Sequence, residues 1–286
     1  MKGSYTYKPV QFFLITNSIM WASWLTAARL SYRPDGGPGR LISVLELVGF
    51  FSPFVTALWM IFTSKSAELK RNCYEKLIDL RLIKLWSIPA ILLLMPAAAV
   101  VSIVLSHLFF GQSLGQLAIV KTSPFIAGMI PLQLLSFAAP LFEETGWRSY
   151  GVDSLRGNRT FFTATLIFGS LWAFWHCALF LVNNYYHNTL LRTNPLFALN
   201  FIVSLFPVAI IINWLWYSNE GSILTPVVFH AVANLQWLLQ MGQIATCIET
   251  VVLIVTAMTI VGFNKEMFFS EFSARIGYFG QKIPSS

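Results

Sequence analysis

Charge is scarce in this chain of 286 residues. Only 11% of its side chains are Asp, Glu, Lys or Arg, whereas roughly 25% is usual for a soluble domain. In contrast, 56% of the residues are hydrophobic, and they include 25 Phe and 10 Trp. A water-soluble fold of this composition would expose large apolar patches to water. The shortage of charge therefore excludes a soluble fold and predicts that lipid surrounds most of the chain.

Cysteine is also rare. The chain has three, Cys73, Cys177 and Cys247, and no two of them have the spacing C-x-x-C. This pattern indicates neither a disulfide framework nor a thiolate metal site.

Apolar runs alternate with short polar breaks along the whole sequence. A bilayer crossing needs roughly 20 apolar residues, and Gly/Pro clusters or charge runs cannot face lipid. We therefore predict an all-α, polytopic integral membrane bundle of about eight transmembrane helices, with residues 1–286 in one membrane domain. The predicted spans are residues 9–29, 41–63, 85–108, 124–142, 161–183, 196–217, 222–241 and 244–263.

The basic residues are distributed unevenly over this topology. Fourteen of the 19 Lys and Arg residues lie in the amino terminus, the loop 64–84, the segment 143–160 and the carboxyl tail, which share one side. Because positive charge concentrates on the cytoplasmic side, we expect both termini in the cytoplasm. The net charge of +7 then reflects orientation and contact with membrane lipids, and we expect no nucleic-acid partner. Residues 264–286 are predicted to form a cytoplasmic amphipathic tail.

Three of the spans carry ionisable or amide side chains, and an ionisable group inside lipid costs on the order of 3 kcal/mol or more. The first group comprises Glu143, Glu144 and Arg148, which we place at the inner end of the fourth span. The others are His176 in the fifth span, and His230 with Asn234 in the seventh.

Helical spacing suggests partners within these groups. Glu144 and Arg148 are four residues apart and can form an ion pair, which leaves Glu143 without a local cation and available as a general base. His230 and Asn234 are also four residues apart and can donate hydrogen bonds into one cavity. A carboxylate, a histidine and a pair of donors are the groups needed to activate water and to hold an oxyanion.

The sequence Glu-Glu-x-x-x-Arg, a His in an aromatic span and His-x-x-x-Asn, in this order on separate helices, resembles the CAAX prenyl protease and bacteriocin-processing family, also called the Abi family. These intramembrane glutamic endopeptidases have an eight-helix core, so the resemblance implies a hydrolase with its catalytic core in residues 124–241. It implies that Glu143 and His176 activate water, that His230 and Asn234 form the oxyanion hole, and that Glu144 and Arg148 support the site. We expect the site to open toward the cytoplasmic face.

Two tryptophans flank the histidine of the second motif. The family often has Phe four residues before this histidine, where this chain has Trp172. Trp172 and Trp175 are candidates for the substrate pocket. The resemblance implies a peptide or protein substrate, which is a prenylated carboxyl-terminal peptide, a bacteriocin leader or another membrane protein.

Other active sites can be weighed against this one. The patterns H-E-x-x-H and G-x-G-D are absent, and Gly111–Gly115 matches G-x-S-x-G but does not follow a predicted strand, as that nucleophile requires. Zinc is an alternative, because Glu143, His176 and His230 could supply a His2Glu ligand set. The ion pair with Arg148 explains the glutamate pair better, so we predict no metal cofactor.

A non-catalytic protein is the second alternative. Buried polar residues could line a pathway in a bacteriocin-immunity or membrane transport protein. The presence of every motif residue favours an enzyme. Glu46 and Glu249 lie outside the motifs, and we assign them no chemical role.

Overall fold

The computed structural model describes residues 5–119, 130–157 and 159–270. Within these ranges the secondary structure is helical, apart from one isolated bridge between Ile119 and Leu239. The α-helices are α1 (Pro9–Ser31), α2 (Gly39–Phe50), α3 (Ser52–Thr63), α4 (Ala67–Ile78), α5 (Ile88–Phe110), α6 (Ile130–Gly146), α7 (Val152–Arg156), α8 (Phe161–Cys177), α9 (Tyr186–Thr193), α10 (Pro195–Ser218), α11 (Leu224–Asn234), α12 (Gln243–Phe263) and α13 (Lys265–Phe269). Short 3-10 turns cover Leu80–Leu82, Leu85–Ser87, Leu114–Leu117, Ala178–Leu181 and Leu235–Leu238, and one π-helical turn covers Trp147–Gly151.

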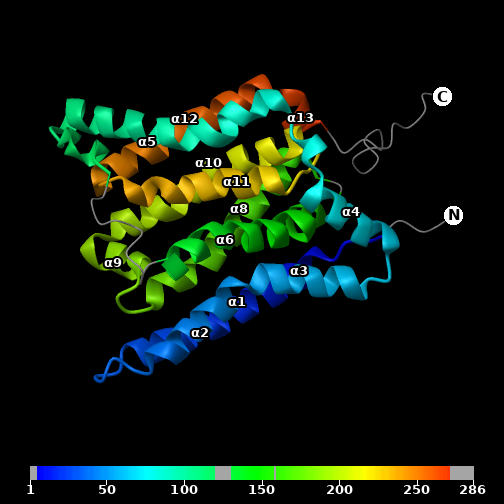
Figure 1. Cartoon of the computed structure of the whole chain (residues 1–286), viewed down its shortest axis with the longest axis horizontal. Helices are drawn as coiled ribbons and strands as arrows, with labels where there is room; N and C mark the ends of the chain where they lie inside the picture. The colour runs from blue at the N-terminus through cyan, green and yellow to red at the C-terminus, as the bar shows by residue number, and fades with distance from the viewer. Residues whose placement is uncertain (1–4, 120–129, 158, 271–286) are drawn as a thin grey trace.

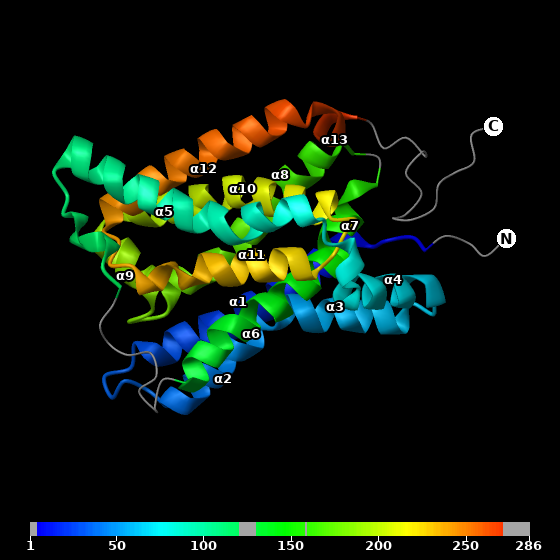
Figure 2. The ribbon, with the colours of Figure 1, turned by 45° about the horizontal axis from the view of Figure 1, so that its top comes forward.

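The long helices lie side by side in one bundle (Figure 1). α1 packs on α2 and α3 along one side of the bundle, and α5 packs on α12 along the other. Between them lie α6, α8, α10 and α11, and α11 contacts both α5 and α6. In Figures 1 and 2 α11 accordingly runs between α5 and α6. The helices that carry the predicted motifs therefore occupy the interior of the bundle.

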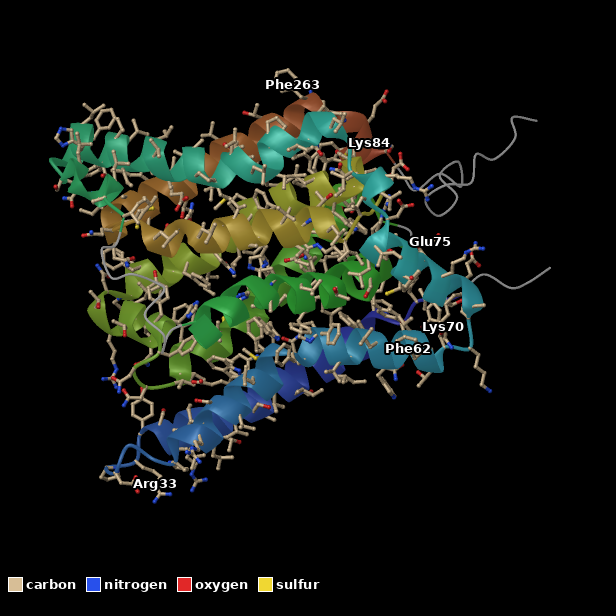
Figure 3. All side chains as sticks on the ribbon, viewed as in Figure 1. Arg33, Phe62, Lys70, Glu75, Lys84 and Phe263 are labelled. Carbon is tan, nitrogen blue, oxygen red and sulfur yellow. The ribbon has the colours of Figure 1, made fainter. Side chains whose placement is uncertain are left out.

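Large side chains fill the interior, and apolar side chains also cover much of the outside. Trp24, Trp147 and Trp216 are completely or almost completely buried. On the outer surface, Phe62 is 63% exposed and Phe263 is 87% exposed (Figure 3). Apolar residues on the outer surface suit a lipid environment, so the chain is an integral membrane protein.

The structure confirms the all-helical fold but not the count of about eight spans. Among the described residues, four stretches are long and apolar enough to cross a membrane: Leu85–Phe110, Phe161–Leu181, Pro195–Ser218 and Gln243–Phe263. A fifth results if α2 and α3 form one span. α11 has only 11 residues, so the predicted span 222–241 is not a continuous helix of full length. The part of the span 124–142 before Ile130 lies outside the described residues.

The predicted span 41–63 is broken in the middle. α2 and α3 meet at Phe51 with a bend of 48°. Pro53 occupies the first turn of α3, where proline is tolerated because that turn needs no amide donors. The bend places the start of α3 against α6.

The two ends of the bundle correspond to the two sides of the charge distribution. α4, α7 and α13 lie at one end, which we call the basic end, and α9 lies at the other (Figures 1 and 2). Lys70 and Lys84 lie at the basic end and Arg33 at the opposite end (Figure 3). The connector 64–84 is largely helical as α4. Of the predicted tail 264–286, α13 is described, and residues 271–286 lie outside the described residues.

Candidate active site

The carboxylates of the first motif lie within one continuous helical run. α6 is followed without interruption by the π-helical turn and by α7, so the helix extends to Arg156. At about 1.5 Å per residue, Glu143 lies about 20 Å from that end. Glu143 and Glu144 lie in the last turn of α6 itself, with the helical run continuing beyond them, so their place at the inner end of the span, and the side on which the site opens, stay predictions.

Glu144 is the centre of the site, with all of its side chain buried. Its Oε2 atom lies 2.8 Å from Nη1 of Arg148, which is also fully buried. Its Oε1 atom lies 2.8 Å from Nδ1 of His230. The predicted ion pair with Arg148 is present, and the bond to His230 is an additional contact. Glu144 therefore connects α6 to α11.

Glu143 lies beside this group and is buried. Its carboxylate interacts electrostatically with His230, Glu144 and Arg148. Its buried Oε2 atom has no hydrogen-bond partner among the described residues. A buried carboxylate oxygen without a partner is costly, and it is free to accept a proton from a bound molecule.

His176 has a fixed ring orientation. Its Nδ1 atom lies 2.8 Å from the carbonyl oxygen of Trp172. Because a carbonyl only accepts, Nδ1 carries the proton and Nε2 presents a lone pair. The imidazole is in edge contact with the indoles of Trp172 and Trp175, with ring centroids 5.2 Å and 4.8 Å away. The ring can therefore act as an acceptor at Nε2.

His230 and Asn234 lie on the face of α11 that meets α6. The side chain of His230 is 18% exposed, and that of Asn234 is half-buried. The Glu144 carboxylate accepts from Nδ1 of His230, so the imidazole, when protonated, has Nε2–H left to donate. Both residues can donate a hydrogen bond to one acceptor.

The predicted pair of Glu143 and His176 is not in direct contact. No hydrogen bond joins these two side chains in the part of the chain that the structure describes. His176 does interact electrostatically with His230. The three helices thus bring the motif residues into one region, with the strongest contacts made by Glu144.

Trp172 and Trp175 are almost completely buried, with 3% and 1% of their surface exposed. The indole nitrogen of Trp175 donates to Oγ of Ser52 at the start of α3. Both rings pack on His176 and therefore fix its position.

Gly146 brings the backbones of α6 and α3 together. A Cβ atom at this position would lie 2.4 Å from the carbonyl carbon of Pro53 and 2.6 Å from the amide nitrogen of Phe54. No side chain larger than hydrogen fits without displacement of a helix. Gly146 and Ser52 thus link the bent α2–α3 pair to α6 and α8, the two helices that carry the first and second motifs.

Sequence reasoning missed these supporting residues, and it gave no role to a further buried carboxylate outside the motifs. Glu249 on α12 is buried, and its Oε1 atom accepts a hydrogen bond from Gln236. The position of Glu249 inside an apolar run was the available signal, because a carboxylate there needs a partner. Ser52 and Gly146 gave no comparable signal, since small residues are common in membrane helices.

The zinc alternative requires three ligand side chains that lie close together. Within residues 5–119, 130–157 and 159–270, no three His, Cys, Asp or Glu side chains are grouped so that they could hold a metal ion. Nδ1 of His230 is hydrogen-bonded to Glu144, and Nδ1 of His176 is hydrogen-bonded to a carbonyl oxygen. On each imidazole, Nε2 is therefore the nitrogen without such a bond to a described residue.

Comparisons with known proteins agree with the motifs. A family model described as type II CAAX prenyl endopeptidase Rce1-like matches residues 124–236, which include all six motif residues. The protein named CAAX prenyl protease 2 of Methanococcus maripaludis is 37% identical over 272 residues, which cover 95% of this chain and 99% of that protein. The resemblance found in the sequence is confirmed: the chain belongs to the Rce1-like family of type II CAAX prenyl endopeptidases, which are membrane proteases.

Proposed function

We propose that the chain is an intramembrane endopeptidase of the glutamic type, which hydrolyses a peptide bond of a prenylated, membrane-associated peptide. The observation that carries this proposal is the arrangement around Glu144. One carboxylate is held by Arg148 and His230, and the neighbouring carboxylate of Glu143 keeps a buried oxygen without a partner.

In the proposed reaction, a water molecule bound between Glu143 and Nε2 of His176 loses a proton to the carboxylate as its oxygen attacks the carbonyl carbon. The negative charge on the carbonyl oxygen is held by Nε2–H of His230 and the amide of Asn234. The C–N bond then breaks, and the amine leaves with the proton that Glu143 received. Arg148 holds Glu144 in place, and Glu144 orients the ring of His230 so that Nε2 is turned toward the bound peptide.

In this mechanism the two adjacent carboxylates have different roles: Glu143 is the base, and Glu144 supports the site. Glu144 has two cationic or cation-forming partners within 2.8 Å, so its charge is balanced. Glu143 shares these cations only at longer range. Carboxylates in environments this different are suited to separate functions, and we assign no metal to the reaction.

The prenyl chain of the substrate is proposed to lie in an apolar groove on the outer side of α1, α2 and α3. Side chains that include Val48, Phe51 and Val55 line this groove. The Phe51 ring also contacts the ring of Phe142, with centroids 4.7 Å apart. Phe142 precedes Glu143, so the groove ends close to the proposed base. We also propose that the basic end faces the cytoplasm, because its cations exceed those of the opposite end.

Replacement of Glu143 tests the proposal. Glu143→Gln keeps the size of the side chain but removes the base, and we expect cleavage of a farnesylated peptide to fall by at least about 1,000-fold, within the range of a lost general base. Glu46→Gln, on the apolar helix α2, is the matched control and is expected to retain activity. A fully active, folded Glu143→Gln protein would overturn the mechanism.

The same assay distinguishes the proposed endopeptidase from the non-catalytic alternative. If the purified wild-type protein binds the farnesylated peptide but releases no product at any concentration of protein, the immunity or transport interpretation is favoured. Cleavage that depends on Glu143 supports the enzyme.

A further inference from the structure

A second buried polar group lies on the side of α11 that faces away from Glu144. Glu249 is only 6% exposed although it lies in α12, one of the helices apolar enough to cross a membrane. The partner of its Oε1 atom is the amide nitrogen of Gln236, 2.5 Å away. The same nitrogen lies 3.1 Å from the carbonyl oxygen of Met95 on α5. One amide thus joins three segments that are distant in sequence.

The position of Gln236 relative to the proposed oxyanion hole gives this group a role. α11 ends at Asn234, and a 3-10 turn from Leu235 to Leu238 continues it. Gln236 is two residues beyond Asn234, so its side chain leaves the helix on a different side from that of Asn234. α11 lies between α6 and α5 (Figures 1 and 2). Gln236 contacts α5 and α12 on one side of the helix end, whereas the proposed function assigns Asn234, on another side, to the oxyanion hole.

We propose that Gln236 and Glu249 are positioning residues that fix the end of α11 and thereby hold the carboxamide of Asn234 in place. His230 is held directly by Glu144 at 2.8 Å, whereas no comparable side-chain hydrogen bond holds the half-buried Asn234 within the described part of the chain. The last turn of α11 is where the helix frays most readily, because its carbonyl groups lack partners within the helix. The hydrogen bonds of Gln236 to Met95 and Glu249 hold this last turn in place, and Asn234 is thereby positioned without a hydrogen bond of its own side chain to any described residue.

The proposal rests on the proposed function, because it assigns Asn234 to the oxyanion hole. The experiment compares kcat and KM for a farnesylated peptide, together with thermal unfolding in detergent. Gln236→Leu is expected to lower kcat by about 10- to 100-fold, the loss that a misplacement of about 1 Å produces, and to change KM by less than about 2-fold, because the donor acts mainly on the transition state.

Two variants of Glu249 distinguish its role as a hydrogen-bond acceptor from the effect of its negative charge. Glu249→Gln keeps an oxygen that accepts from Gln236, so kcat should stay within about 3-fold of wild type. Glu249→Leu removes the acceptor and should match Gln236→Leu. The control is Gln116→Leu, which removes a buried glutamine whose Oε1 atom holds the amide of Gly242. It should lower the unfolding temperature and leave kcat of the folded protein unchanged.

Combination with Asn234→Ala gives the decisive result. If Gln236 acts through Asn234, the double variant should be no slower than Asn234→Ala alone, within about 2-fold. If the two losses multiply, Gln236 has only a structural role and the inference fails while the proposed function stands. If Asn234→Ala alone keeps full activity, the oxyanion assignment fails and the inference fails with it.

Discussion

Nδ1 of His230 lies 2.8 Å from Oε1 of Glu144, so a carboxylate on α6 orients an imidazole on α11. The same carboxylate neutralises Arg148. Two chargeable groups, Arg148 and His230, therefore depend on the side chain of Glu144.

Replacement of Glu144 should affect stability and activity together. Glu144→Gln leaves Arg148 buried without its anion, which costs about 3–5 kcal/mol, and it removes the negative charge beside His230 while keeping an oxygen that accepts from Nδ1. We expect a lower unfolding temperature and a loss of cleavage of about 100-fold or more, as for a lost oxyanion donor. In Glu144→Gln/Arg148→Met, the unfolding temperature should partly recover and cleavage should not. A double variant with restored activity would contradict the role of Glu144.

Ser52 should matter although it lies on α3. Ser52→Ala removes the acceptor of the buried Trp175 indole, and a buried donor without a partner costs about 1–3 kcal/mol. Because Trp175 packs on His176, kcat should also fall by several-fold. Ser52→Thr keeps the hydroxyl and serves as the control in thermal unfolding and peptide cleavage. Equal behaviour of the alanine and threonine variants would speak against this hydrogen bond.

Substitution by alanine should have opposite effects on the stability of the protein at Gly146 and at Gly262. A methyl group at position 146 would overlap the backbone of α3, whereas nothing lies within 4 Å of a Cβ atom at position 262 in α12. Gly146→Ala should destabilise the protein by about 1–3 kcal/mol or more, as overpacking does. Gly262→Ala should stabilise it by up to about 1 kcal/mol through helix propensity. Thermal unfolding of the two variants is the measurement, and a neutral Gly146→Ala would rule out the close approach.

The basic end contains a buried ion pair outside the site. Nζ of Lys76 on α4 lies 2.8 Å from Oδ2 of Asp153 on α7, and both side chains are more than 90% buried. Asp153→Leu should destabilise the protein by about 3–5 kcal/mol, because it leaves a buried cation without its anion. Lys76→Met/Asp153→Leu should be markedly more stable than Asp153→Leu. If the double variant were the least stable in thermal unfolding, the pair would not be coupled.

Chelation should leave the enzyme active. We assign no metal to the reaction, so dialysis against a strong chelator is expected to change the rate of peptide cleavage by less than about 2-fold, within the scatter of such assays. Elemental analysis of the purified protein provides the second readout. A stoichiometric zinc ion whose removal abolishes cleavage would replace the glutamate mechanism by the His2Glu alternative.

The sequence predicted the helical class and the motif residues because both depend on local signals. Apolar runs identify helices, and a four-residue spacing identified the ion pair of Glu144 and Arg148. The break at Phe51 could have been suspected from the adjacent proline, but the 48° bend depends on how α3 packs on α6. The extension of α6 through a π-helical turn to Arg156 was missed, since polar residues after Glu143 suggested the end of a span.

Contacts between distant segments could not be predicted from one sequence. The bond of His230 to Glu144 and that of Gln236 to Glu249 require a known arrangement of α6, α11 and α12. Glu249 lacks a motif around it, and its partner lies 13 residues away in a different helical segment. The family resemblance supplied the candidate residues of the site, whereas the contacts around them emerged only from the packing of the helices.

If a substrate enters from the basic end, the continuous helical run beyond Glu143 sets a minimum length for the segment that joins its folded part to the scissile bond. A peptide in extended conformation advances about 3.3 Å per residue, so about six residues are needed to cover the 20 Å from the level of Arg156 to Glu143. A folded domain attached closer than this to the scissile bond would collide with the end of the bundle. The enzyme would then select substrates by the length of the linker between their folded domain and their lipidated end, independently of the linker sequence.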